Sequence, residues 1–405
     1  MANVSSSNGL EKRPKLRFPG FDEPWEHKEL LHYLVENTDR NKQLKFGKEN
    51  VLSVSGEYGI VNQIAFQGRS FAGESVADYH VVETDDIVYT KSPLKAKPYG
   101  IIKVNNGVPG IVSTLYAVYH PLKTVVPRFV DFYFSNDLRL NKFLKPLVNI
   151  GAKHDMKVNN TFVLTGMVVF PPLREQQKIV DFLTILDRRI DVQRKKVEAL
   201  KKYKRGLLNQ IFSAISKGSQ RRKLRELVHV SGGKTPSMSN SLYWNGDIVW
   251  ISSKDMKSSR ISGSELKITN LALNEMTLYH PGTLLLVARS GILKHSLPLA
   301  ILEVDATINQ DIKALQVHGC NAFYLYYAIL SQEDNIIRTL VKTGTTVQSL
   351  MMDSFLNIEI PTPDIDQQQS IIDKLAKLEK YVDVQEKELS LLSQMRNGLL
   401  QQLFI

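Results

Sequence analysis

Residues 171–213 read PPLREQQKIVDFLTILDRRIDVQRKKVEALKKYKRGLLNQIFS, and residues 363–405 read PDIDQQQSIIDKLAKLEKYVDVQEKELSLLSQMRNGLLQQLFI. The two stretches align without a gap at a constant offset of 192 residues, and 17 of the 43 aligned pairs are identical. Repetition at a distance close to half of the chain length indicates one structural plan written twice. We therefore expect two copies of a globular segment followed by a long helix.

Apolar residues in both stretches recur at alternating steps of four and three residues. A 3.5-residue period sustained over several heptads is typical of a coiled coil rather than of an ordinary surface helix. Each series is interrupted at the same two places, by a glutamine and by a basic residue. The predicted seam comprises Ile179, Leu183, Leu186, Ile190, Gln193, Val197, Leu200, Leu207, Ile371, Leu375, Leu378, Val382, Gln385, Leu389, Leu392 and Leu399.

Two such helices in one chain pair most simply with each other. Full antiparallel overlap would bring Gln193 and Gln385 close together near the middle, where a polar contact can fix the register. The stretch 171–213 carries 11 basic and 5 acidic side chains, whereas 361–405 carries 5 and 7. Opposite net charges favour this pairing over the pairing of like with like. A plain dimerisation coil is the alternative interpretation of the heptads.

The segment before each helix is rich in short apolar runs with turn residues between them. We expect strands such as 111–118, followed by single helices at 128–144 and 321–340. The fold class is therefore α+β: two tandem globular domains and two long helices that form an antiparallel coiled coil, related by a pseudo-twofold repeat. The expected divisions are a flexible tail at 1–14, a first domain at 15–170, a first long helix at 171–215, a second domain at 216–360 and a second long helix at 361–405.

The charge and cysteine content narrow the class of protein. The net charge is +11, and an excess of basic side chains is expected of a partner of polyanions such as nucleic acid. Cys320 is the only cysteine, which excludes internal disulfides and fits the reducing cytoplasm. The sequence holds neither an apolar run long enough to cross a membrane nor an apolar stretch typical of a secretory signal.

Loops between the expected strands carry side chains of the types that commonly contact DNA. Asn, Gln, Arg and Lys hydrogen-bond base edges, while Lys, Ser, Thr and backbone amides hold phosphates. Basic and amide-bearing loops recur at like positions in both halves of the chain. The predicted DNA-binding residues are Ser55, Tyr58, Lys91, Ser92, Lys95, Lys97, Lys153, His154, Lys234, Thr235, Ser237, Arg289, Ser290, Asn309, Gln310, Thr345, Thr346 and Gln348.

Signals for catalysis are weak. The stretch 231–235, Ser-Gly-Gly-Lys-Thr, resembles the end of a phosphate-binding loop, but Val228 stands where that motif needs its first glycine. Asp255 with the triplet Glu265-Leu266-Lys267 could suggest a metal-dependent nuclease, although a Glu-x-Lys triplet is common by chance. No cysteine cluster exists to hold zinc. We therefore predict no catalytic residue and no metal site, and interpret the chain as a reader of DNA.

Several stretches resemble a known family, the DNA-specificity subunits of type I restriction-modification systems. Residues 14–21 with Trp25 and Leu30 look like the opening of that family. The stretches 232–237, 243–248 and 250–252 resemble its second-half signature, and the glutamine pairs at 176–177 and 368–369 resemble its helix entries. The resemblance covers nearly the whole chain beyond Pro14.

The resemblance implies two target-recognition domains, each of which reads one half of a split site in double-stranded DNA, and a coiled coil that sets the spacer. It implies assembly with two modification subunits, which methylate adenine using S-adenosylmethionine, and with up to two restriction subunits, which use ATP and Mg²⁺. No cofactor is expected on this chain, which would act in the cytoplasm without a membrane. The alternative is a structural or adaptor coiled-coil protein that binds nucleic acid non-specifically.

Overall fold

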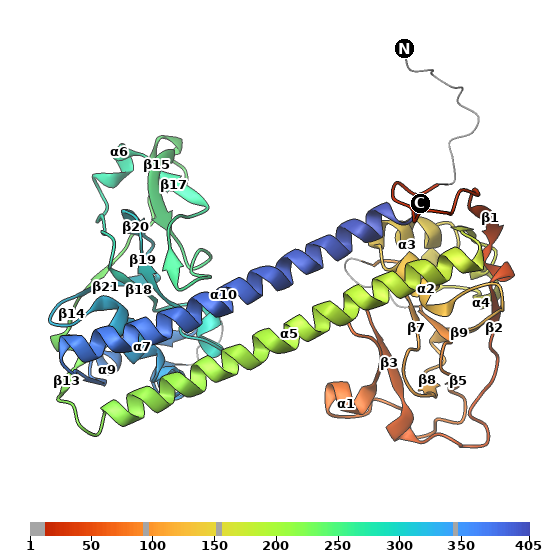
Figure 1. The fold of residues 1–405 in the computed structure, drawn as a ribbon, viewed down its shortest axis with the longest axis horizontal. Coiled ribbons are helices and arrows are strands. Elements are labelled where there is room, and N and C mark those ends of the chain that lie inside the picture. The colour runs from red at the N-terminus through yellow and green to blue at the C-terminus, as the bar shows by residue number, and fades with distance from the viewer. Residues whose placement is uncertain (1–12, 92–96, 151–155, 343–346) are drawn as a thin grey trace, which may run out of the picture. The chain divides into compact units, whose positions relative to one another are not determined.

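The computed structural model describes residues 13–91, 97–150, 156–342 and 347–405 (Figure 1). Nearly all of the predicted flexible tail, at 1–14, lies outside these residues. The chain forms two compact units, the first made of Met1–Arg194 with Glu388–Ile405 and the second of Lys195–Lys387. No helix within the described ranges is long and apolar enough to span a membrane.

Two long helices follow the sequence repeat. Helix α5 covers Leu173–Ile215, and helix α10 covers Ile365–Gln402. The Asp364 carboxylate accepts a 2.8 Å hydrogen bond from the backbone N–H of Gln367, which satisfies a free donor in the first turn of α10. The first unit therefore contains the beginning of α5 and the end of α10, and the second unit contains the remainder of both helices.

The first unit is a mixed α+β fold around an antiparallel sheet of order β2-β9-β6-β7. Smaller antiparallel pairs join β1 to β12, β3 to β4, β5 to β8 and β10 to β11. Its strands are β1 (Glu26–Glu29), β2 (Leu34–Glu36), β3 (Leu52–Ser55), β4 (Gly59–Asn62), β5 (His80–Val82), β6 (Ile87–Thr90), β7 (Ile101–Val104), β8 (Gly110–Val112), β9 (Tyr116–Pro121), β10 (Asn149–Ile150), β11 (Met156–Lys157) and β12 (Met167–Phe170). Its short helices are α1 (Gln63–Gln67), α2 (Pro127–Phe134), α3 (Asp137–Leu144) and α4 (Asn160–Val163).

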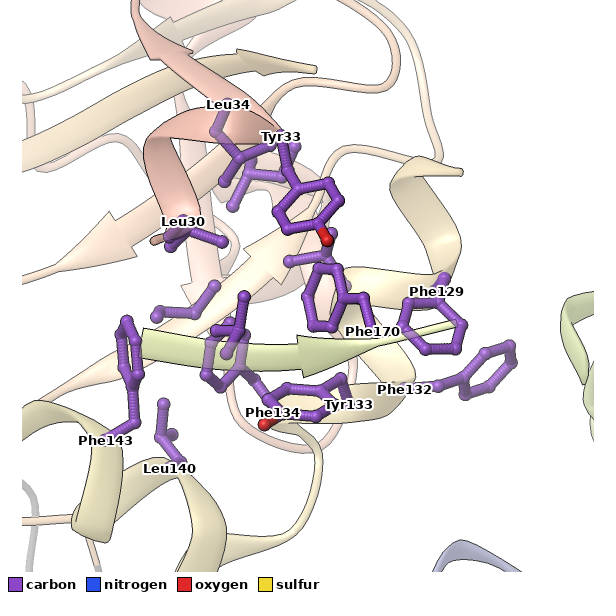
Figure 2. Close-up of a cluster of buried hydrophobic side chains, with 14 of the residues drawn as sticks. Leu30, Tyr33, Leu34, Phe129, Phe132, Tyr133, Phe134, Leu140, Phe143 and Phe170 are labelled. Atoms are coloured by element: carbon purple, nitrogen blue, oxygen red, sulfur yellow. The ribbon is translucent and has the colours of Figure 1, made fainter. Parts of the chain in front are cut away.

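Aromatic rings fill the core of this unit (Figure 2). Phe170, at the end of β12, packs edge-on against Phe129 and Tyr133 of α2, with ring centroids 5.0 and 4.9 Å apart. Leu183 of α5 and Phe404 beyond α10 belong to the same buried cluster. The first domain and the ends of the two long helices therefore share one hydrophobic core.

The second unit repeats this plan with larger sheets. Its sheets have the orders β14-β21-β18-β19-β16 and β17-β15-β20, with the added pairs β13-β24 and β22-β23. The strands are β13 (Arg221–Lys223), β14 (Val228–Gly232), β15 (Trp244–Ile251), β16 (Arg260–Ile261), β17 (Leu266–Ile268), β18 (Leu284–Val287), β19 (Leu299–Leu302), β20 (Ala306–Ile308), β21 (Ile312–Val317), β22 (Val341–Lys342), β23 (Ser349–Leu350) and β24 (Glu359–Pro361). The short helices are α6 (Asn270–Leu273), α7 (Ala322–Leu330), α8 (Glu333–Leu340) and α9 (Met352–Phe355).

The repeated glutamines attach each long helix to its domain. The side-chain oxygen of Gln176 accepts a 2.9 Å bond from the backbone N–H of Val126, the residue before α2, and its amide nitrogen donates to the Pro171 carbonyl. Gln368 makes the same two bonds, with Asn321 before α7 and with Pro363. Because both glutamines are buried, the loss of either partner would leave an unsatisfied polar group.

The long helices pair antiparallel within each unit. In the first, Leu186 and Ile190 of α5 form a cluster with Leu392 of α10. In the second, partner numbers fall along α10 as they rise along α5, since Lys201 pairs with Glu386 and Lys204 with Glu379. The fold class that we expected is therefore confirmed, as an α+β fold with two long helices in contact.

Burial along the predicted seam is uneven. The fully buried seam residues are Ile179, Leu183, Leu186, Ile190, Gln193, Val197, Ile371, Leu375, Val382, Gln385 and Leu392, whereas Leu200, Leu207, Leu378, Leu389 and Leu399 are half-buried. Toward the end of each helix the buried residue is the next one along, Leu208 in α5 and Leu400 in α10. This one-residue shift follows from the 3.6-residue turn of a straight helix, which drifts away from a 3.5-residue pattern. The predicted contact between Gln193 and Gln385 stays a prediction.

The basic residues that interrupt the seam have acidic partners. Lys204 bonds the Glu379 carboxylate, and at the equivalent place in the repeat Arg396 bonds Asp187. Each acid also faces the globular domain of its own unit: Asp187 lies 3.9 Å from the Arg128 guanidinium of α2, and Glu379 accepts a 3.0 Å bond from the Tyr327 hydroxyl of α7. Each ion pair thus joins three helices in its unit.

Three predicted elements are divided in the structure. The helix predicted at 128–144 is α2 followed by α3, because Asn136 accepts a bond from the Arg139 backbone N–H and starts a new helix. The helix predicted at 321–340 is likewise α7 followed by α8. The strand predicted at 111–118 is β8 and β9, separated by a turn that the Ser113 carbonyl closes with Tyr116 N–H at 3.0 Å.

Shortening a side chain should destabilise the protein more at a buried seam position than at an exposed position of the same helix. Leu183→Ala should lower the free energy of unfolding by about 2–5 kcal/mol, because Leu183 is fully buried among both long helices and the first domain. Ile185→Ala, two residues along and 67% exposed, should change it by about 0.5 kcal/mol or less. Chemical denaturation checks both variants. Equal effects would contradict the assignment of Leu183 to the seam.

Candidate nucleic-acid interface

A glycine brings the loop after β14 against strand β20 in the second domain. The backbone N–H of Lys234 donates a 3.0 Å bond to the Ile308 carbonyl. A Cβ on Gly233 would lie 2.0 Å from that same carbonyl oxygen, so only glycine fits at this close approach. The loop is therefore fixed on its strand, with the side chains of Lys234 and Thr235 exposed.

Two tryptophans hold the rest of this loop. The Trp250 indole N–H donates to the Lys234 carbonyl at 3.1 Å, and the Trp244 indole N–H donates to the Ser237 carbonyl at 3.0 Å. The two rings pack edge to face, 5.2 Å apart. Trp250 is buried and Trp244 is half-buried, and through these bonds and their ring contact the two indoles support the loop.

Three further loop segments of the second domain join this surface. Thr235 donates its hydroxyl to the Gln310 side chain. The Asp311 carbonyl accepts a bond from Ala288 N–H at 2.8 Å, which links 309–311 to the end of β18. Ser290 N–H donates in turn to the Gln348 carbonyl at 3.0 Å. Hydrogen bonds and the packed rings of Trp244 and Trp250 therefore connect the described residues predicted to bind DNA in this domain: Lys234, Thr235, Ser237, Arg289, Ser290, Asn309, Gln310 and Gln348.

The residues in this group differ in what they offer to a ligand. Lys234, Thr235, Ser237, Arg289 and Gln310 expose their side chains. Asn309 is buried, and its side-chain oxygen accepts a bond from Asp311 N–H. The Ser290 hydroxyl likewise accepts from Ile292 N–H. Asn309 and Ser290 therefore shape the loops, and the exposed residues are the ones placed to contact a partner.

In the first domain, the described residues predicted to bind DNA do not form one connected group. The Ser55 hydroxyl accepts bonds from the backbone N–H groups of Glu57 and Tyr58, which forms the β3–β4 turn and leaves the Tyr58 ring exposed. Lys97 lies beside this turn at Gly56 and forms a 2.9 Å ion pair with Asp137. The remaining predicted residues Ser92, Lys95, Lys153 and His154, and Thr345 and Thr346 of the second domain, lie outside the described residues.

Lys91 belongs to a polar network that the sequence did not reveal. Its ammonium donates to the Asn160 side chain at 3.1 Å, and Asn160 donates to the Glu36 carboxylate at 2.9 Å. Partial burial, and then the nearby Arg40 guanidinium, lower the pKa of Lys91. Burial, followed by Arg40 and Lys91, also lowers the pKa of His80 to about 4, so that this imidazole is neutral at pH 7.

Asp255 and Glu265, which the sequence suggested as possible nuclease residues, take part in hydrogen bonds that shape a loop. One Asp255 oxygen accepts bonds from the Ser252 backbone N–H and hydroxyl, and the other accepts from Glu265 N–H at 2.9 Å. Among the described residues no group of three or more His, Cys, Asp and Glu side chains could hold a metal ion. Asp255 therefore serves as the acceptor that closes its loop.

Comparison with known proteins assigns the family. The chain matches the family described as "Type I restriction modification DNA specificity domain" over residues 72–202 and 216–394, and it belongs to that family. It is 38% identical to the specificity subunit of the type I restriction enzyme EcoR124I/EcoR124II of Escherichia coli over 160 residues, which are 38% of this chain and 40% of that protein. It is 30% identical to the MjaIX specificity subunit of Methanocaldococcus jannaschii over 190 residues, 45% of this chain and 43% of that one. The matched part thus spans under half the length of each of these two relatives.

Solved structures show the same fold. The S subunit of a type I restriction-modification system from M. genitalium has a TM-score of 0.59 at 14% identity, with 97% of this chain and 99% of that chain covered. A chain from a study of complex assembly and conformational transition of the type I R-M system has a TM-score of 0.55 at 16% identity, with 96% and 99% covered. At these identities the likeness concerns the fold alone.

The close approach at Gly233 predicts a local steric effect. Gly233→Ala should lower the free energy of unfolding of the second domain by about 1–3 kcal/mol, because the added methyl group meets backbone rather than a movable side chain. Gly263→Ala is the matched control, since a Cβ there meets nothing within 4 Å. Thermal unfolding of the two variants checks this. Equal melting temperatures would show that the loop is not held against β20.

Proposed function

We propose that this chain is the DNA-specificity subunit of a type I restriction-modification complex, in which each recognition domain reads one half of a bipartite site. The observation that carries the proposal is the connected surface of the second domain, in a chain of this family. Lys234 and Arg289 offer positive charge to phosphates, while Gln310 offers both a donor and an acceptor to base edges.

The long helices have the further role of setting the spacer and docking methyltransferase subunits. Phe182, Ile185 and Val192 recur on one face of α5 and are exposed in the first unit, although they are large and apolar. Apolar side chains that line an exposed helix face are typical of protein–protein contacts. In the second unit Tyr381 and Val384 of α10 are likewise exposed.

The proposed complex supplies the chemistry that this chain is not expected to perform. Two modification subunits would bind S-adenosylmethionine and methylate adenine, and up to two restriction subunits would use ATP and Mg²⁺. This chain would contribute the DNA contacts, and it would work in the cytoplasm on double-stranded DNA. The test is footprinting of the complex reconstituted with an adenine methyltransferase subunit, which should protect two short sequences separated by an unread spacer. If random duplex competes for the complex as well as the specific duplex does, the result would support the non-specific adaptor instead.

A charge substitution checks the contact with DNA. Lys234→Gln should reduce the slope of log affinity against log salt concentration by about 0.9, because one phosphate contact and its released counterion are lost. Lys202→Gln is the control, since Lys202 is exposed on α5 outside the connected loops. Fluorescence anisotropy over a series of salt concentrations gives both slopes. Equal slopes for Lys234→Gln and the unmodified protein would show that Lys234 does not contact a DNA phosphate.

A further inference from the structure

Two apolar side chains beside the connected loops of the second domain, Met238 and Leu242, are exposed to solvent. Met238 is 67% exposed and Leu242 is 68% exposed. The Asn240 backbone N–H donates a 3.2 Å bond to the Ser237 carbonyl, which closes a turn with Met238 at its first corner. Turn corners usually carry polar or small residues, because they face water. A methionine at this corner is therefore an unusual feature.

Hydrogen bonds fix the backbone of the turn that carries Met238. The Ser237 carbonyl that closes it also accepts the Trp244 indole N–H, and the Ser237 and Ser239 hydroxyls are 2.8 Å apart. The Asn240 side chain accepts a 3.1 Å bond from Leu242 N–H and fixes the second apolar residue. These bonds fix the backbone of the turn, and both apolar side chains remain exposed on it.

The surroundings of the turn indicate what covers it. Lys234 and Thr235 precede Met238 in the same loop, and the Thr235 hydroxyl bonds Gln310. On the neighbouring strand β21, the Lys313 ammonium lies 3.1 Å from the point where a Cβ of Gly232 would be. Hydroxyls and ammonium groups around an apolar tip match a DNA duplex, which presents phosphates. The duplex offers apolar surface at the thymine methyl groups and in the gap between stacked bases, and a projecting, unbranched side chain such as Met238 fits the gap.

We propose that Met238, supported by Leu242, is an apolar wedge that enters between adjacent base pairs of the half-site read by the second domain. The inference rests on the proposed function and deepens it, because it assigns a deformation of the DNA to a residue of this chain. Insertion unstacks one base step and kinks the duplex. Enzymes that modify a base must take it out of the stack, and a step that is already unstacked opens at lower cost.

The experiment uses the complete complex with its methyltransferase subunits and duplexes that carry 2-aminopurine at successive positions of the second half-site. The fluorescence of 2-aminopurine rises when it is unstacked, so the unmodified complex should give a rise at one step. Met238→Ala should remove most of that rise and weaken specific binding about tenfold, because the wedge is lost. Met238→Leu, which keeps an apolar side chain of similar size, should retain both.

Val108→Ala is the matched control. Val108 is 74% exposed in a loop of the first domain and should alter neither the fluorescence nor the affinity at the second half-site. Because Met238 is exposed, Met238→Ala should leave the melting temperature unchanged, so that lost binding cannot be attributed to unfolding.

The possible failures are distinguishable. Specific binding by the unmodified complex without a fluorescence rise, or with a rise that Met238→Ala retains, overturns the wedge and leaves the proposed function intact. A Met238→Ala variant that loses its methyltransferase subunit but not its DNA contacts shows a protein-binding patch and also overturns the wedge. An unmodified complex that binds every sequence equally overturns the proposed function together with the wedge.

Discussion

The structure depends on the antiparallel contact of the two long helices, and on the ion pairs that lie within it. Asp187 with Arg396, and Glu379 with Lys204, stand at equivalent places in the repeat. A partly buried charge is costly unless it is paired, so each base in the seam favours the alignment that gives it an acid. Glu379 also bonds Tyr327, and Asp187 faces Arg128, so the same residues attach each recognition domain to the helices.

The attachment of each domain to the helix pair explains why function can be divided between loops and helices. Within each unit, the domain core continues into the helix pair, as Phe404 shows by packing 5.4 Å from the ring of Phe129. Loops such as 233–240 can then vary in sequence without loss of the scaffold that carries them. A rigid link between each reading domain and the helices would make the distance between two half-sites a property of the protein, which is the basis of the proposed function.

The sequence predicted those features that arise from local or repeated patterns. The 3.5-residue period of Leu183 and Leu375 identified the helices, and the repeated Gln176 and Gln368 marked their beginnings. It could not predict contacts between residues far apart in the chain, such as the bond from Asn160 to Glu36, because no local spacing records them. The predicted helix at 128–144 was wrong in length because the side chain of Asn136 starts a second helix, a polar effect that apolar periodicity does not measure.

The proposed function requires that the helix pair hold two DNA-reading domains at a fixed span. Inserting seven residues into the middle of both α5 and α10 preserves the heptad pattern and lengthens the pair by about 10 Å. Sequencing of methylated sites made by the complex with its modification subunits then reports the spacer between unchanged half-sites. The account predicts a spacer longer by about 3 base pairs, at 3.4 Å per base pair. An active complex that keeps the original spacer would contradict it.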